Sequence, residues 1–416
     1  MITFHFMDKS HMANLEENNF NKVWEKSDKA FTYLKELPSS LPLLRDLNSD
    51  LTDIKAEAKR YQKFDDVIIL GTGGSSLGGQ AILALRETAT PRIHFLDNID
   101  AHTFNKTLKG IDPKKTGVIA ISKSGNTAET LMQLLTCFDL WQDLSLKDHF
   151  LIVSENADNA IREIAKKHNL PCLDHPKDIG GRFSAFTVVA MLPAFIAGID
   201  AEAFRKGAQE TLDMLRASTL QYCAPLIGAA LQIAFYKQGI NQSVLFVYSD
   251  RLKLLSNWFC QLWAESIGKK GPDDKGIGTT PISALGAVDQ HSQLQLYLAG
   301  PRDKFFTFVT LENQYPLKAL SLEGFDHPAI MSLNGKTMGE LMIAEQKATI
   351  DTMRTQKCPL RQLQIKKLDA TNLGALMMHF MLETIAAAYL LEVNPFDQPA
   401  VEEGKILALQ YLQATH

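Results

Sequence analysis

The chain has 416 residues, of which 45% are apolar, and its 43 basic and 47 acidic residues give a formal net charge of −4. At about 100 to 200 residues per domain, this length predicts two or three domains that each bury a core, and the composition excludes intrinsic disorder and a small disulfide scaffold. The near-neutral charge, without a long basic run, argues against nucleic acid or an anionic membrane as a partner. The five cysteines form no C-x-x-C pair, so we predict neither a zinc knuckle nor a dithiol redox site.

The N-terminal part of the chain, residues 1–60, is polar and predicts a helical segment with a turn near residues 38–42. Its first twelve residues lack the continuous apolar core of a secretory signal. The apolar stretch at residues 373–391 is interrupted by His379 and Glu383, which argues against a membrane span. We therefore expect a cytoplasmic protein.

Short apolar runs alternate with helix-compatible segments after residue 60. The strand-like runs are residues 67–70, 93–96, 117–121, 150–153, 244–248 and 305–311. This alternation is typical of parallel strands joined by helices. We predict an α/β protein with a first domain over residues 61–205 and a second over residues 206–390, followed by a helical arm over residues 391–416. From residue 334 onward the pattern is mostly helical and predicts few strands.

A glycine-rich loop, residues 71–79 (GTGGSSLGG), follows the first of these strands. Glycines at the carboxyl end of a strand let backbone N–H groups approach an anion, and the N-terminus of the next helix adds a favourable dipole. The spacing fits neither the dinucleotide fingerprint nor the P-loop, because Ser76 replaces a glycine and Gly79 replaces a lysine. It does satisfy G-x-S-x-G, so a phosphate cradle, a nucleophilic Ser76 and a plain turn all stay open.

A second polar loop, residues 122–130 (SKSGNTAET), follows the strand at residues 117–121. It carries hydroxyls, a lysine and a glycine at the start of another helix, where Ser124 or Asn126 could simply be the N-cap. Ligands of open α/β sheets lie at the carboxyl edge of the strands. Two such loops at successive strand ends therefore favour one shared phosphate site over two unrelated caps.

Four further residues suit acid–base or charge-stabilising chemistry, and each also has a structural interpretation. Arg182 follows two glycines and could be a surface turn residue. Glu265 stands four residues before Lys269, a spacing typical of an ion pair on a helix. His291 could be a satisfied core histidine, and Lys405 could pair with the glutamate three residues before it.

Two long segments resemble the signatures of the glucose-6-phosphate isomerase family, in its short bacterial form. Residues 178–184 (DIGGRFS) resemble the first signature and residues 396–405 (FDQPAVEEGK) the second. The resemblance implies two SIS-type, flavodoxin-like parallel-sheet domains with a helical N-terminal cap and a helical C-terminal arm. It implies an aldose–ketose isomerase that interconverts glucose 6-phosphate and fructose 6-phosphate in glycolysis and gluconeogenesis. Glu265 motivates the hypothesis of metal-free proton transfer, and we expect no cofactor.

The resemblance also implies roles for individual residues. Glu265 matches the catalytic base, and Arg182 matches the arginine that stabilises the enediolate. His291 and Lys405 match the ring-opening groups. The positions that match substrate-binding residues are Gly74, Ser75, Ser122, Lys123, Ser124, Thr127 and Gln398. Family members are usually dimers, which implies a homodimer with His291 contributed across the interface.

The reaction explains why these residue types are required. Ring opening needs a proton removed from the C1 hydroxyl and another delivered to the ring oxygen. One carboxylate that reaches both C1 and C2 can then carry a proton through a cis-enediol, and such positioned groups contribute about 10² to 10⁴-fold. A fixed arginine stabilises the enediolate charge, and the phosphate adds remote binding energy.

Three alternatives stay open from the sequence. The loop residues 124–126 (SGN) also resemble other SIS proteins, which include mannose-accepting isomerases and sugar-phosphate sensors. A non-catalytic sensor is therefore the first alternative, and for an isomerase the substrates could also include mannose 6-phosphate. A serine hydrolase built on Ser76 is the second alternative, and a metal-dependent hydride shift is the third.

Overall fold

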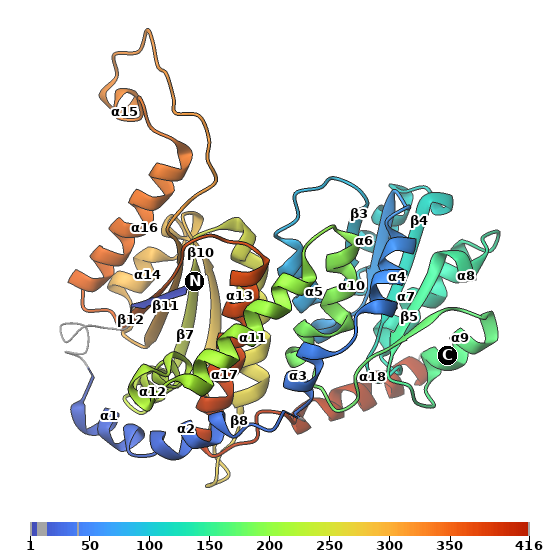
Figure 1. Cartoon of the computed structure of the whole chain (residues 1–416), viewed down its shortest axis with the longest axis horizontal. Helices are drawn as coiled ribbons and strands as arrows, with labels where there is room; N and C mark the ends of the chain where they lie inside the picture. Colours follow the sequence, from blue (N-terminus) through green and yellow to red (C-terminus); the bar gives the residue numbers. More distant parts are fainter. Residues whose placement is uncertain (1, 6–14, 40, 415–416) are drawn as a thin grey trace.

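A computed structural model describes residues 2–5, 15–39 and 41–414, and it contains two five-stranded sheets flanked by helices (Figure 1). The first sheet has the order β3-β2-β4-β5-β6, and all its strand pairs are parallel. Its strands are β2 (Asp66–Leu70), β3 (Arg92–Leu96), β4 (Thr116–Ile121), β5 (Phe150–Ser154) and β6 (Cys172–Asp174). In chain order this is the 2-1-3-4-5 arrangement of a flavodoxin-like sheet, as the sequence predicts.

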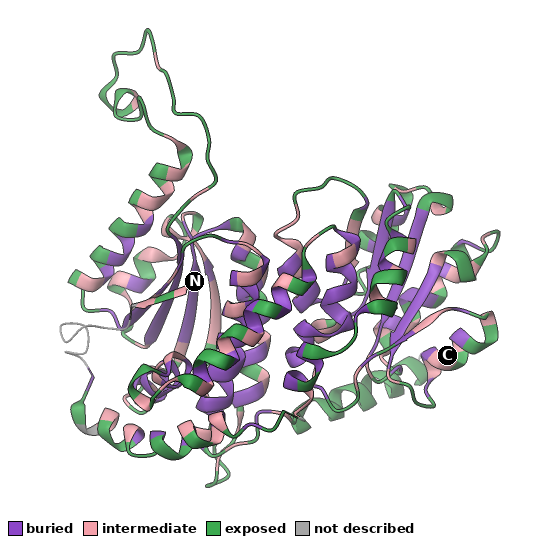
Figure 2. Ribbon diagram, in the orientation of Figure 1, coloured by how far each residue is buried: buried purple, intermediate pink, exposed green. Residues whose placement is uncertain are grey.

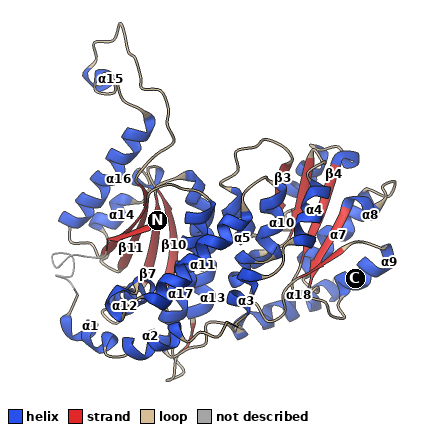
Figure 3. Cartoon of the chain, in the orientation of Figure 1, coloured by secondary structure: helices blue, strands red, loops and turns tan. Residues whose placement is uncertain are grey.

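The second sheet repeats the arrangement over four strands and adds an antiparallel edge strand (Figure 3). Its order is β1-β12-β11-β7-β10. The strands are β7 (Gln242–Val247), β10 (Thr280–Leu285), β11 (Lys304–Leu311), β12 (Leu360–Ile365) and β1 (Ile2–His5). The N-terminal segment is therefore not helical throughout, and the C-terminal half supplies a strand where helices are expected. β12 reads LRQLQI and has a single β-branched residue, which explains why its sequence does not predict a strand.

Helices cover both faces of these sheets. The N-terminal helices are α1 (Glu17–Trp24), α2 (Ser27–Lys35) and α3 (Pro42–Arg45). Those around the first sheet are α4 (Thr52–Tyr61), α5 (Leu77–Leu83), α6 (Ala101–Lys109), α7 (Ala128–Leu140), α8 (Leu146–His149), α9 (Ala160–His168) and α10 (Val188–Ile196). The remaining helices are α11 (Ala201–Ala217), α12 (Ala224–Tyr236), α13 (Lys253–Ile267), α14 (Leu294–Ala299), α15 (Pro328–Met331), α16 (Met338–Thr355), α17 (Ala370–Leu391) and α18 (Glu402–Ala414). The domain limits at residues 60, 205 and 390 stay predictions.

Helix α17 is the core helix of the second half of the chain. By length and composition it could cross a membrane, but 89% of its apolar window is buried, and it packs against α11, α12 and α13 (Figure 2). The Glu383 carboxylate that interrupts its apolar run is bound inside the core by Arg361, with nitrogen–oxygen distances of 2.6 and 3.0 Å. Gln232 of α12 donates to the same carboxylate at 2.6 Å. The charge is therefore paired within the protein, as a buried charge requires.

Helix α18 and the segment at residues 312–341 lie outside the two helix-covered sheets. Every residue of α18 is exposed, and the segment at residues 312–341, which carries α15, projects from the second sheet (Figure 1 and Figure 2). Both segments expose large apolar side chains, among them Leu317 and Phe325 on the projection and Ile406 and Leu409 on α18. A single chain thus leaves several large apolar side chains on each segment uncovered, as is common at interaction surfaces.

Candidate active site

The two loops with glycines and hydroxyls leave the same edge of the first sheet. β2 and β4 are parallel neighbours, with Leu70 opposite Ala120. Because the carboxyl ends of parallel strands meet at one edge, the loops after Leu70 and after Ile121 begin side by side. The expectation of a shared loop edge is therefore confirmed.

The first loop contacts the segment that carries Arg182. It forms the short 3₁₀ helix Gly73–Ser75, which brings Gly74 so close to Gly181 that a β-carbon on Gly74 would lie 2.3 Å from the Gly181 carbonyl carbon. Ser184 Oγ donates to the Gly74 oxygen at 3.2 Å. Gly74 is thus required by a close approach of backbone, and its loop is tied to the first signature.

Ser76 is fully buried behind this loop. Gln80 Nε2 donates to Ser76 Oγ at 2.5 Å and to Asp97 Oδ2 at 2.6 Å. Ser76 therefore belongs to a buried polar cluster, where its hydroxyl is closed to a substrate. The arrangement does not support a hydrolase nucleophile, which needs an exposed hydroxyl beside a base.

The second loop is shaped by a hydroxyl pair and a tight glycine. Ser122 Oγ donates to Thr127 Oγ1 at 3.0 Å. Gly125 has a φ of +70°, and a β-carbon there would lie 2.1 Å from Asn159 Oδ1. The loop therefore requires glycine at this position and turns its hydroxyls toward the start of α7.

The N-terminus of α7 is free of a side-chain cap. Its N-cap is Thr127, whose side chain makes no capping hydrogen bond. Neither Ser124 nor Asn126 is the N-cap, and Ser124 Oγ accepts from the Asn126 N–H at 3.3 Å. Lys123 Nζ lies 3.5 Å from Glu155 Oε1. Uncapped N–H groups, hydroxyls and an ammonium at one helix start form a favourable environment for an anion.

Arg182 is the centre of the most highly connected cluster. It lies on the 3₁₀ helix Gly181–Phe186, and its side chain is only 1% exposed. Its Nη1 is 3.1 Å from Glu265 Oε2 and 3.2 Å from Gln398 Oε1, and its Nε donates to Ser266 Oγ at 2.9 Å. Three predicted site residues are therefore in direct contact, and the surface-turn interpretation of Arg182 is wrong.

The remaining nitrogen of Arg182 binds backbone next to Gln398. Nη2 donates to the carbonyl oxygens of Pro395 and Asp397, at 2.5 and 2.8 Å. Burial lowers the pKa of Arg182 from its ordinary value, and the neighbouring Glu265 carboxylate opposes this shift. The guanidinium is therefore a fixed, desolvated cation with an acceptor for each nitrogen.

Glu265 lies near the end of α13 and keeps a third of its side chain exposed, at 31%. Gln261, one turn earlier on α13, donates from Nε2 to Glu265 Oε1 at 3.0 Å. Gln261 is not among the site residues predicted from the sequence, although its i,i+4 spacing from Glu265 indicates that the two side chains can meet on one helix face. The expected ion pair of Glu265 with Lys269 does not form, because α13 ends at Ile267 and Lys269 instead binds Asp397 at 2.6 Å.

His291 and Lys405 lie apart from this cluster. His291 follows the 3₁₀ helix Val288–Gln290 and is exposed, so the core-histidine interpretation is wrong. Lys405 lies on α18 with 62% of its side chain exposed, and its Nζ is 2.8 Å from Glu402 Oε1, as the structural interpretation predicts. Within the described residues, neither side chain forms a hydrogen bond or ion pair with Arg182 or Glu265.

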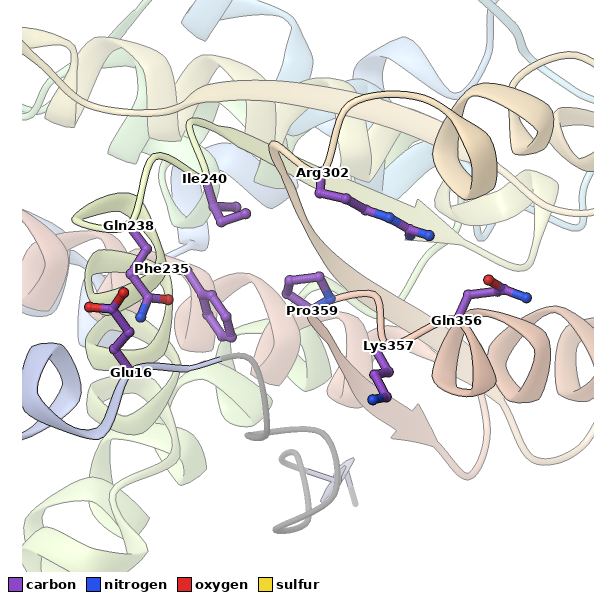
Figure 4. A pocket seen from close by; sticks show the side chains of 8 residues that line it. All are labelled: Glu16, Phe235, Gln238, Ile240, Arg302, Gln356, Lys357 and Pro359. Atoms are coloured by element: carbon purple, nitrogen blue, oxygen red, sulfur yellow. The ribbon is translucent and has the colours of Figure 1, made fainter.

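A cavity of about 470 Å³ lies at the opposite edge of the second sheet, near the starts of β11 and β12 (Figure 4). Phe235, Ile240 and Pro359 form its apolar wall, and Arg302 lies at one side. None of the site residues predicted from the sequence lines this cavity. The candidate site is therefore the Arg182 cluster with the two loops of the first sheet.

Comparison with known proteins identifies the family. The profile of the phosphoglucose isomerase family matches residues 35–416. The chain belongs to this family. It is 36% identical to a glucose-6-phosphate isomerase of Thermus thermophilus, an alignment that covers 90% of this chain and 91% of that protein. It is 35% identical to the glucose-6-phosphate isomerase of Rubrobacter xylanophilus, over 84% of this chain and 83% of that protein.

Solved structures support the same fold. A hypothetical protein from Thermus thermophilus superposes with a TM-score of 0.88 at 31% identity, over 99% of this chain and 100% of that chain. A glucose-6-phosphate isomerase from Chlamydia trachomatis superposes with a TM-score of 0.80 at 20% identity, over 100% of this chain and 89% of that chain. The family, the SIS-type α/β fold and the assignment as an aldose–ketose isomerase of glucose 6-phosphate and fructose 6-phosphate are thus confirmed.

Proposed function

We propose that the chain interconverts glucose 6-phosphate and fructose 6-phosphate with Glu265 as the base that moves a proton between C2 and C1. The observation that carries this proposal is the contact of Arg182 Nη1 with both Glu265, at 3.1 Å, and Gln398, at 3.2 Å. An enediolate needs a fixed cation beside the base, because negative charge develops on the sugar oxygens as the proton leaves carbon. Arg182 supplies that cation from a buried position.

In the proposed isomerisation, Glu265 removes the proton from C2 of the open-chain aldose. The C2–H electron pair forms the C1=C2 double bond, and the C1 carbonyl oxygen takes up the negative charge. Arg182 stabilises this enediolate while the proton of the C2 hydroxyl passes to the C1 oxygen. Glu265 then returns its proton to C1 as the C2–O bond becomes the ketose carbonyl. The hydrogen bond from Gln261 to Glu265 Oε1 leaves Oε2 as the oxygen next to Arg182.

Ring opening is assigned to His291 and Lys405. An imidazole can take the proton of the C1 hydroxyl near neutral pH, and an ammonium can deliver one to the ring oxygen. Both side chains are exposed, so each is open to substrate and to a second chain.

Substrate binding is assigned to the two loops of the first sheet and to the second signature. We infer that Ser122, Lys123, Ser124 and Thr127 bind the phosphate at the uncapped start of α7. Gly74, Ser75 and Gln398 are the inferred sugar contacts. The Ser184 hydrogen bond to Gly74 and the Arg182 contact with Gln398 support this placement, because they link both regions to the first signature.

We infer that the protein is a homodimer in which His291 completes the partner's site. The exposed apolar side chains of α18 and of the projection at residues 312–341 support an interface, since a single chain leaves them uncovered. His291 is exposed and forms no hydrogen bond with Arg182 or Glu265 in the part of the chain that the structure describes, which fits a role in trans. We also infer that the enzyme acts in the cytoplasm, where glycolysis and gluconeogenesis use both sugar phosphates.

The decisive experiment is isomerisation of fructose 6-phosphate, detected with a coupling enzyme specific for glucose 6-phosphate. Wild type should be active, and Glu265→Gln should lose about 10²-fold or more of kcat because the base is removed without a change of shape. Glu163→Gln, on the exposed side of α9, is the matched control and should be unaffected. A folded wild type that binds sugar phosphate without turnover would favour the sensor, and a parallel reaction with mannose 6-phosphate sets substrate breadth.

Mixing two inactive variants tests the shared site. In a heterodimer of His291→Ala and Glu265→Gln, one site would combine an intact Glu265 with an intact His291, while the other would lack both. Activity should therefore return when the chains exchange. Heterodimers that form and stay inactive would show that each chain uses its own histidine.

A further inference from the structure

Lys269 is a nearly buried cation that the proposed mechanism does not use. It begins the small hairpin of β8 (Lys269–Lys270) and β9 (Gly276–Ile277), directly after α13. Its side chain is only 9% exposed, whereas that of the neighbouring Lys270 is 74% exposed. A buried ammonium is costly unless it is paired, so the partner of Lys269 indicates its purpose.

That partner is Asp397 in the second signature. Lys269 Nζ lies 2.6 Å from Asp397 Oδ1 and also donates to the Asp397 backbone oxygen. Asn394 Nδ2 donates to the other carboxylate oxygen at 3.2 Å. The hydrogen bond from Lys269 holds the pKa of Asp397 below its ordinary value, so this carboxylate is charged at neutral pH.

Lys269 and Arg182 bind the same short segment from two sides. The Asp397 backbone oxygen accepts from Arg182 Nη2 at 2.8 Å as well as from Lys269. The next residue, Gln398, contacts Arg182 Nη1. The position of one peptide therefore sets both the orientation of the guanidinium and the place of the inferred sugar contact.

We propose that Lys269 is a positioning residue for the isomerisation, which through Asp397 holds residues 395–398 against Arg182. Without the ammonium, Asn394 is the one hydrogen-bond donor left to the Asp397 carboxylate among the described residues, and the carbonyls that fix Arg182 Nη2 move with the loop. The guanidinium then loses its alignment with the enediolate, although it keeps Ser266 and Glu265. The proposal rests on the proposed function, because it concerns the same Arg182 cluster.

The test compares Lys269→Met with Lys270→Met in the full chain, with fructose 6-phosphate as substrate. Lys269→Met should lower kcat by about 10 to 10²-fold, the effect of a small misplacement of a catalytic group, with a smaller change in KM because the inferred phosphate loop is untouched. Lys270→Met removes an equal charge from an exposed pair with Asp274 and should leave both constants unchanged. Unchanged kcat in Lys269→Met would overturn the proposal, whereas an inactive wild type would overturn the proposed function instead.

A double-mutant cycle tests whether Lys269 acts through Asp397. Asp397→Asn keeps the shape of the side chain but leaves Lys269 without its carboxylate. In the double variant with Lys269→Met, no buried charge is left unpaired. The double variant should lose no more kcat than Lys269→Met alone, since the two residues form one unit. Losses that multiply would overturn the action through Asp397.

A stable analogue separates alignment from a merely structural role. The probe is a five-carbon sugar-acid phosphate, whose planar carboxylate replaces the enediolate. Lys269→Met should lose more affinity for this analogue than for fructose 6-phosphate, and Lys269→Arg should recover part of the loss. Equal losses for both ligands would indicate general loosening and would overturn the proposal.

Discussion

Arg182 and Lys405 are both predicted cations of the active site, but the structure places them in opposite surroundings. Arg182 is 1% exposed, and its nitrogens bind side chains of α13 and the backbone oxygen of Asp397 in the second signature. Lys405 is 62% exposed, on a helix that is exposed throughout, and it binds Glu402 one turn away. The first cation is fixed by the tertiary fold, whereas the second is fixed by its own helix alone.

This difference indicates that one chain brings together the residues proposed for proton transfer but not those proposed for ring opening. The interior cluster contains the proposed base Glu265, the proposed stabilising cation Arg182 and the inferred sugar contact Gln398, a set that suits proton transfer at C1 and C2. The proposed ring-opening residues Lys405 and His291 are exposed, so under the inferred dimer we expect contacts with the partner to align them. We therefore expect substitutions in the interior to affect both stability and kcat, and those on the exposed elements to affect kcat alone.

The largest effect is expected for Arg182→Lys. A lysine cannot reach the five acceptors of the guanidinium, so kcat should fall by about 10² to 10³-fold, as for loss of an oxyanion donor. The melting temperature should fall as well, because buried carbonyls lose their donors. Arg205→Lys is the matched control, since Arg205 is also buried and binds the Phe186 and Ser49 carbonyls. It should lower stability and spare kcat, and an equal loss of kcat would show that any buried arginine is required.

A smaller effect is expected for Lys405→Met. Loss of a ring-opening group should lower kcat by about 10²-fold. The melting temperature should not change, because an exposed ion pair contributes only about 0–1 kcal/mol. Glu402→Gln breaks the same ion pair and should leave kcat unchanged. If both variants lost activity equally, the ion pair itself would be required. Lys405 would then depend on a fixed partner, as Arg182 does.

A charge among the exposed apolar side chains of α18 tests whether assembly supplies the missing contacts. Leu409→Asp should weaken the inferred dimer, so that specific activity falls on dilution while wild type stays constant. Gln410→Asp adds the same charge beside it and should have less effect, because it removes no apolar side chain. Light scattering after size exclusion measures the mass of each variant. A dimer that withstands Leu409→Asp would place the interface elsewhere.

The fold could be predicted wherever a strand is buried along its whole length and is mostly apolar. β2, β4, β5 and β11 are buried along their whole length, and each coincides with a predicted apolar run. β12 could not be predicted, because Arg361 and two glutamines interrupt its apolar pattern, and the partner that makes Arg361 acceptable lies on α17. Its strand character therefore depends on a tertiary contact.

The site could be predicted as a set of residues but not as a set of contacts. Long signatures identify Arg182 and Gln398, which the fold joins across 216 positions of the chain. The i,i+4 spacing is compatible with a pair of Lys269 and Glu265, whereas in the structure Lys269 binds Asp397. Gly268 directly after the last residue of α13 is a helix-stop signal that places Lys269 outside the helix. The correct partner still requires knowledge of where the C-terminal signature folds.

The smallest effect is expected for the Asp397 carboxylate. Its exposure is intermediate between that of Arg182 and that of Lys405, since 53% of its side chain is exposed although its partner Lys269 is nearly buried. Lys269 lowers the pKa of Asp397 in the folded chain, relative to about 3.9 for a free aspartate. The folded state therefore binds this proton less readily than the unfolded state, so the contribution to stability is present above about pH 3.9 and is lost as pH falls through the folded pKa.

The free energy of unfolding of wild type should thus exceed that of Asp397→Asn by a constant small amount between pH 7 and about pH 5, and the difference should shrink below about pH 4. Urea titrations at each pH measure this difference, and added salt should reduce it only in part, because one partner is shielded from solvent. Asp274→Asn breaks the exposed pair with Lys270 and should show no such dependence. A difference that is equally large at low and neutral pH would mean that the shape of Asp397, and not its charge, stabilises the loop. The ion pair with Lys269 would then contribute as little as the exposed pair of Lys405.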